Sequence, residues 1–201
     1  MLTKIERKTC FKNFPKFPKA NYRKEEFYFP EIIESHTLTL KAKTLKGHIK
    51  SLANEITCLA EKFNFDSLIF LGDEKIPWLF QKNEYKPVKE ALQFLKKNKV
   101  EQNFDGALQI ELASLPDFLK HFCWLVRCNA SLPYFHFMDK GQNVICEICK
   151  YCNLHLYPLN TFTNKTLKRL IKYTAFESLK DQICYEQYFK KSAITGRQII
   201  V

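Results

Sequence analysis

The sequence predicts an α+β, or mixed α/β, domain built on a single sheet. Residues 36–126 alternate strand patterns with helix patterns, and residues 133–157 have the pattern of a strand meander followed by C-terminal helices. The composition agrees, because 46% of the residues are hydrophobic and the chain holds 18 Phe and 9 Tyr, which is enough for a real core. A length of 201 residues suits one domain.

The first 35 residues are predicted to form a basic, aromatic arm, and residues 36–201 the domain itself. Prolines at 15, 18 and 30 stand among Phe and Lys. The prolines predict that this arm forms neither a regular helix nor a central strand. The aromatic residues indicate that the arm packs against a surface, either the body of this chain or a partner.

The first elements of the domain follow from apolar periodicity. Residues 37–43 alternate strictly, which predicts a half-buried strand. Apolar residues recur at helical spacing over 46–64, which predicts an amphipathic helix. The apolar run at 67–71 predicts a buried strand, and Pro87 opens the next helix.

The second half of the domain continues the alternation and then departs from it. Residues 107–112 predict a strand and 114–126 a helix. Strands at 134–138 and 144–149 are joined by a turn at 139–142, and 152–157 adds a third strand. Helices are expected near 164–174 and, more weakly, 176–190, with a closing strand at 197–201. A meander after a strand–helix alternation makes the expected sheet mixed.

The hairpin suggests one catalytic cluster. A two-residue turn at 140–141 would place His136 and Glu147 diagonally on one face, near Cys149. A histidine with an orienting acid beside a thiol is one arrangement of base and nucleophile. The alternative is a satisfied polar pair at a sheet edge. These three residues are candidate catalytic residues of a small enzyme whose reaction the sequence does not name.

The sharpest local motif is a run of cysteines. Cys146, Cys149, Cys152 and His155 fall at intervals of three, and thiolates and imidazole are ligands of zinc and of iron–sulfur clusters. However, no second Cys-x2-Cys pair exists, and a strand over 144–149 would point Cys146 and Cys149 to opposite faces. The alternative is buried thiols, so we expect no cofactor, with zinc or iron at these four residues as a further hypothesis.

Positive charge gathers at the two ends of the chain. The net charge is +11; residues 1–24 hold eight Lys/Arg against one acid, and residues 163–201 hold eight against three. We therefore expect a non-enzymatic binding protein for a protein or an anionic partner, nucleic acid included. The alternative is an ordinary solvated lysine-rich surface. The candidate contacts are Lys12, Lys16, Lys19, Arg23, Lys24, Lys165, Lys168, Arg169 and Lys172.

Several classes of protein are disfavoured. The five glycines stand singly, which excludes a phosphate-binding loop and the dinucleotide pattern, and neither G-x-S-x-G nor H-E-x-x-H occurs. No apolar run reaches 18 residues and the N-terminus lacks an export signal. We therefore expect a cytoplasmic protein with no membrane partner and with reduced cysteines.

Overall fold

The computed structural model of the protein describes residues 1–21, 26–74, 76–81, 84–128, 135–179, 183–185 and 187–188. The strands are β1 (Leu2–Ile5), β2 (Lys19–Asn21), β3 (Glu26–Tyr28), β4 (His36–Thr39), β5 (Ser67–Leu71), β6 (Ala107–Glu111), β7 (His136–Asp139), β8 (Val144–Ile148), β9 (Leu154–Pro158) and β10 (Glu177–Ser178). The helices are α1 (Arg7–Asn13), α2 (Leu45–Lys62), α3 (Lys86–Lys97), α4 (Leu115–Cys128) and α5 (Thr161–Ile171), with a 3-10 turn at Leu112–Ser114.

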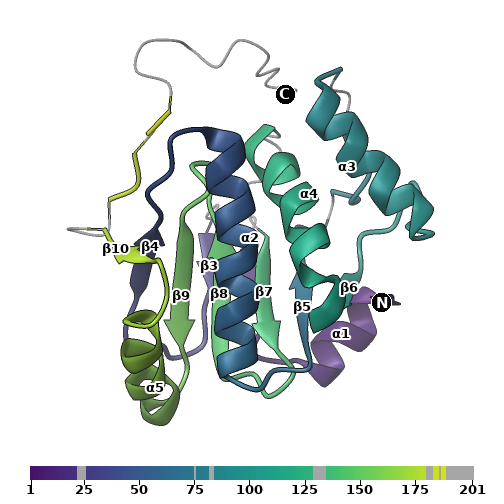
Figure 1. Ribbon diagram of the computed structural model, residues 1–201. Coiled ribbons are helices and arrows are strands. Elements are labelled where there is room, and N and C mark those ends of the chain that lie inside the picture. Colours follow the sequence, from purple (N-terminus) through teal and green to yellow (C-terminus); the bar gives the residue numbers. More distant parts are fainter. Residues whose placement is uncertain are drawn as a thin grey trace.

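Eight strands form the main sheet in the order β1-β6-β5-β7-β8-β9-β4-β10, and β2 pairs with β3 in a separate ribbon. The predicted α+β class is confirmed. The prediction of a mixed sheet, with both parallel and antiparallel pairs, is wrong. Every pairing among the described strands of this sheet is antiparallel. Helix α3 belongs to the connection from β5 to β6 and packs on α4 (Figure 1). Because β5 and β6 are antiparallel neighbours, this connection does not have to cross over the sheet.

One face of the sheet carries the larger core. Helices α2 and α4 lie across this face (Figure 1), which we call the helical face. They bury Leu52, Ala53, Leu119 and Phe122 against inward side chains of the sheet such as Phe70. The apolar spacing of α2 and α4 predicts this packing. No helix in the described part of the chain is long and apolar enough to cross a lipid bilayer.

The opposite face, which we call the back face, is covered by the N-terminal residues. Cys10 and Phe17 are buried there against Ile69, Met138 and Ile145 of the sheet. The arm therefore packs on the body of its own chain. Strand β1 also pairs with β6 at the edge of the main sheet. The expectation that no regular helix forms in the arm is wrong for α1, because this helix ends before the first proline, Pro15.

Two further elements differ from the sequence predictions. Strand β4 ends at Thr39 and not at residue 43. It was predicted to be half-buried, but both of its faces are buried, and Gln187 donates a hydrogen bond to the Thr39 hydroxyl. The prediction of a weak helix at 176–190 is wrong at its start, because Glu177 and Ser178 form β10, which pairs with β4. The strand expected at 197–201 lies outside the described residues.

The β7–β8 turn sets the register of the hairpin. The buried Asp139 carboxylate accepts hydrogen bonds from the backbone N–H groups of Asn143 (2.8 Å) and Val144 (3.1 Å). Four residues therefore separate the strands, not two, and His136 pairs with Glu147 and Phe137 with Cys146. The diagonal placement of His136 and Glu147 is wrong. The assignment of faces stands, because the register moves by two residues and side chains alternate with a period of two.

Candidate functional site

A row of polar side chains crosses the back face of the sheet. The register places Thr37 of β4 opposite His155 of β9, His155 opposite Glu147 of β8, and Glu147 opposite His136 of β7. Directly opposite residues of an antiparallel pair have neighbouring side chains on one face. We call Thr37, His155, Glu147 and His136 the polar row. Polar groups on a covered face need a reason, which makes this row the candidate functional region.

At one end of the row, His136 lies beneath the arm. The rings of Phe27 and Phe29 meet its imidazole edge-on, with centroids 5.0 and 5.3 Å away. The side chain is only 4% exposed, and burial lowers the pKa of His136 to about 4. This histidine is therefore neutral at neutral pH and offers one donor and one acceptor nitrogen.

In the middle of the row, Glu147 is hydrogen-bonded to Tyr157. Burial raises the pKa of Glu147 to about 7, and the hydrogen bond from the Tyr157 hydroxyl works in the opposite direction. Burial, followed by the nearby Glu147, raises the pKa of Tyr157. In the described residues no hydrogen bond joins Glu147 to His136. The candidate catalytic trio of His136, Glu147 and Cys149 therefore shares a face of the sheet without forming a hydrogen-bonded chain.

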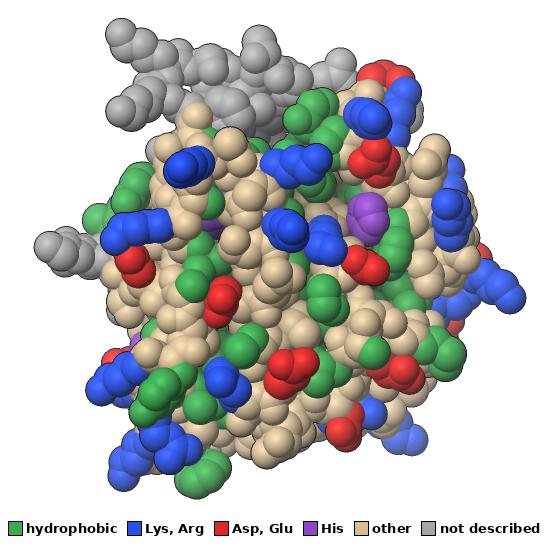
Figure 2. Space-filling view, viewed as in Figure 1, with side chains coloured by type: hydrophobic (Ala, Val, Ile, Leu, Met, Phe, Trp, Pro, Cys, Tyr) green, Lys and Arg blue, Asp and Glu red, His purple; other side chains and the backbone are tan. Residues whose placement is uncertain are grey.

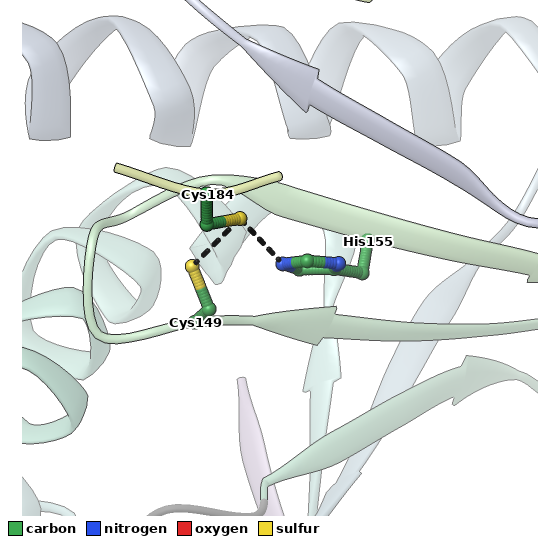
Figure 3. A group of neighbouring side chains, drawn as sticks. All are labelled: Cys149, His155 and Cys184. Atoms are coloured by element: carbon green, nitrogen blue, oxygen red, sulfur yellow. Dashed lines mark hydrogen bonds between the residues drawn. The ribbon is translucent and has the colours of Figure 1, made fainter. Parts of the chain in front are cut away.

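At the other end of the row, three ligand-type side chains converge. The Sγ atoms of Cys149 and Cys184 are 3.7 Å apart, and Cys184 Sγ lies 3.3 Å from His155 Nε2. Figure 3 shows the three side chains pointing toward one another. All three ligand atoms lie within 4.8 Å of one another. Among the described residues this is a group able to hold a metal ion.

Local structure positions each member of this group. His155 sits in β9, and Cys149 follows β8 directly, where its N–H donates to the Asn153 carbonyl at 3.1 Å. Cys152 adopts a φ of 60°, which turns the chain tightly from β8 into β9. Cys184 arrives from beyond β10. The Leu179 N–H, bonded to the Thr37 carbonyl at 2.9 Å, holds that segment along β4.

The electrostatics of the group argue against a free thiolate nucleophile. Burial, followed by the neighbouring Cys184, raises the pKa of Cys149 to about 12. Burial also lowers the pKa of His155. A thiolate–imidazolium pair needs both shifts to run the other way. A thiolate here would need a positive charge from elsewhere, which a divalent cation could supply, since coordinated thiols lose their protons.

The four sequence-predicted ligands do not meet as a set. Cys146 and Cys152 are buried in the core of the helical face, whereas Cys149 and His155 lie at the back face. The expectation that strand alternation separates Cys146 from Cys149 is confirmed. Cys184, the third member of the group, was missed, because it is an isolated cysteine 29 residues beyond His155 and carries no motif of its own.

The basic candidates for partner contact lie at separate places. Lys12 is exposed on α1, Lys16 contacts Gln142, and Lys19 lies in β2. On α5, Lys165 and Arg169 are exposed and Lys168 pairs with Glu34 at 2.6 Å. Lys172 is exposed directly after the last residue of α5, and Arg23 and Lys24 lie outside the described residues. Figure 1 shows α1 and α5 near opposite edges of the sheet. On the face seen in Figure 2, Lys and Arg side chains alternate with Asp and Glu.

Comparison with known proteins found no family model that matches this chain and no similar protein among curated sequences or solved structures. Any function must therefore be argued from the residues and their geometry.

Proposed function

We propose that this protein is a metal-binding module in which Cys149, His155 and Cys184 coordinate a zinc ion. The observation that carries the proposal is the convergence of their three ligand atoms within 4.8 Å. Two thiolates and one imidazole form a donor set typical of zinc. An iron–sulfur cluster, the other hypothesis from the sequence, is less well supported because it takes four protein ligands.

Two of the three distances between ligand atoms are close to those of tetrahedral coordination. Zn–S bonds of about 2.3 Å at tetrahedral angles put two ligand sulfurs about 3.8 Å apart, and the Sγ atoms of Cys149 and Cys184 are 3.7 Å apart. A sulfur and an imidazole nitrogen should be separated by about 3.6 Å, and the observed distance is 3.3 Å. Small side-chain movements would admit the ion.

The surroundings resemble the outer shell of a metal site. Thr37 Oγ1 lies 3.3 Å from His155 Nδ1, so the remaining ring nitrogen, Nε2, faces the sulfurs. Both polar side-chain atoms of Asn153, beside Cys149, are buried and have no hydrogen-bond partner among the described residues. A water on the fourth coordination position would satisfy an amide left alone in this way.

The role of the metal would be to tie the chain beyond β10 to the sheet. Cys149 and His155 belong to neighbouring strands, whereas Cys184 comes from a segment that contacts β4 by few hydrogen bonds. Metal-binding free energy becomes folding free energy when the ligands come together only in the folded chain. The zinc would therefore hold the segment around Cys184 against the polar row.

Elemental analysis of the purified, untagged protein tests this proposal. We expect about one zinc per chain in the wild type and loss of that zinc in Cys184→Ser. Cys58→Ser is the matched control, because Cys58 is a half-buried thiol on α2 outside the ligand group. Metal-free wild type after purification and zinc titration, or equal zinc in Cys184→Ser, contradicts the proposal.

A second role, contact with an anionic partner, is supported by α5. The side chains of Lys165 and Arg169 on this helix, and of Lys172 directly after it, are exposed, and among the described residues none of the three forms an ion pair. Such a surface binds polyanions in a salt-dependent manner. Exchanging these three residues for Gln should abolish binding to a single-stranded oligonucleotide at low salt; unchanged binding would remove α5 from this role.

A further inference from the structure

A cavity of about 230 Å³ lies between the arm and the back face, apart from the cysteine–histidine group. Phe11, Phe17 and Phe27 of the arm line its apolar side. Its polar side is formed by Arg7, Glu74 and His136. The volume is below that of pockets for drug-sized ligands, so only a smaller molecule would fit.

The guanidinium of Arg7 is fixed at the cavity wall. Its Nη2 donates to the carbonyls of Gly72 (2.7 Å), Asp73 (2.9 Å) and Asp105 (2.8 Å), and its Nε donates to Asp105 (3.1 Å). Among the described residues, none accepts a hydrogen bond from Nη1. The side chain is only 15% exposed, and its Nε also lies 3.8 Å from the Asp105 carboxylate, so Nη1 is the part of the guanidinium left for a ligand. Arg7 therefore presents a preorganised cationic donor, which is the group proteins use for carboxylates.

The other polar groups carry different charges. Glu74 is exposed at the rim, next to the segment that holds Arg7, and forms no ion pair with any described residue. Lys19 adds a second cation from β2, and Asp73 a second carboxylate. The ring nitrogens of His136 make no hydrogen bond within the described part of the chain. A neutral histidine adds one donor and one acceptor without adding charge.

We propose that this cavity binds a free α-amino acid with an apolar side chain. The ligand carboxylate would meet Arg7 and Lys19, and its ammonium group would meet Glu74. Its side chain would lie against Phe11, Phe17 and Phe27. Two opposite charges beside an aromatic wall distinguish such a zwitterion from a simple amine or acid, each of which leaves one charged group of the protein unpaired. The site does not depend on the proposed metal.

Three probes of one shape test the ligand class. L-leucine carries both charges, 3-methylbutylamine lacks the carboxylate and 4-methylpentanoate lacks the ammonium group. Isothermal titration and ligand-observed NMR at millimolar concentration should show binding of L-leucine, with each analogue weaker by about tenfold, since each loses a charge-assisted contact. L-phenylalanine serves as a second zwitterion. The proposal is wrong if neither amino acid binds or if the analogues bind equally well.

One exposed substitution tests the site without threatening the fold. Glu74→Gln should weaken L-leucine about tenfold and leave 4-methylpentanoate unchanged. Glu6→Gln is the matched control, because Glu6 is an exposed acid just before α1 that does not line the cavity. L-leucine should also shift the ring NMR signals of His136, assigned with His136→Gln, and leave those of His48, on the helical face, unmoved. Equal effects of the two Glu variants, or an unmoved His136, overturn the assignment.

Discussion

His136 and Glu147 lie directly opposite each other on β7 and β8, and burial inverts the usual order of their pKa values. Burial disfavours the charged form of each group, so it lowers the pKa of the histidine to about 4 and raises that of the carboxyl to about 7. Burial therefore favours the uncharged form of each side chain. An ion pair between these two neighbours would reverse both shifts.

The first prediction concerns pH and His136. Its folded-state pKa lies below the unfolded value, so the unfolded chain binds the proton more tightly and stability falls as the pH drops from about 6.5 toward 4. Between pH 7 and pH 5 this group alone should cost roughly 2 kcal/mol. Urea unfolding at both values should show a smaller loss for His136→Phe than for the wild type. Equal losses in the two proteins would contradict the burial of this ring.

The second prediction concerns metal removal. If zinc joins Cys149, His155 and Cys184, a chelator should destabilise the loaded protein by about 4 kcal/mol at free zinc a thousandfold above Kd, or roughly ten degrees in Tm. Thermal unfolding with and without chelator measures this. Cys58→Ser should respond like the wild type, and Cys184→Ser should not respond. A wild type indifferent to chelator would leave the segment around Cys184 without a metal link.

The third prediction concerns the β7–β8 turn. Asp139→Ala removes the acceptor of two backbone N–H groups and of the Asn143 side chain, which lies 2.8 Å from Oδ2. Leaving these donors unpaired should cost about 3 kcal/mol in the free energy of unfolding. Lys140→Ala, at an exposed position in the same turn, should change stability by about 0.5 kcal/mol or less. Denaturant titration of both variants decides, and similar values would mean that the carboxylate does not organise the turn.

The fourth prediction concerns the arm. Phe17 is 2% exposed on the back face, and Phe17→Ala should destabilise the whole protein by about 3–5 kcal/mol. Phe162 is 80% exposed, and Phe162→Ala should change stability by no more than about 0.5 kcal/mol. A Phe17→Ala protein as stable as Phe162→Ala would show that the arm does not contribute to the fold.

The fifth prediction compares two glycines. A Cβ at Gly72 would lie 2.4 Å from the ring of Phe135, whereas one at Gly47 would meet only Thr44 Oγ1 at 3.2 Å. Gly72→Ala should therefore destabilise by about 1–3 kcal/mol through overpacking. Gly47→Ala lies in α2 and should be neutral or stabilising by about 0.5 kcal/mol, since alanine favours helix. Thermal unfolding separates the two, and a destabilised Gly47→Ala beside an unaffected Gly72→Ala would refute this packing.

The helices and central strands could be predicted because local pattern and tertiary burial agree there. The stripe through Leu52 and Ile56 and the apolar run at 67–71 need no distant information. The faces of the β7–β8 hairpin were also predictable, since alternation fixes them. Its register was not, because it depends on which N–H groups the Asp139 carboxylate accepts from.

Only two of the three residues of the candidate metal site, Cys149 and His155, could be predicted from the sequence. Cys149 and His155 are near in sequence, at the end of β8 and in the neighbouring β9, so their motif pointed to the correct region. Cys184 joins them through the β10–β4 pairing, a long-range contact with no local signature. The burial of the arm depends in the same way on the whole back face. A sequence of prolines among Phe and Lys does not by itself distinguish an arm that packs on its own domain from one that does not.

The pairing of β4 with β9 has a consequence for synthesis on the ribosome. Thr37 and His155 meet across these strands although 118 residues separate them. At about 5–20 residues per second, β4 leaves the ribosome on the order of ten seconds before its neighbour exists. During that time this buried strand has no edge to join, and closing so long a loop slows folding further. The nascent chain should therefore depend on chaperones more than a domain whose neighbouring strands follow one another.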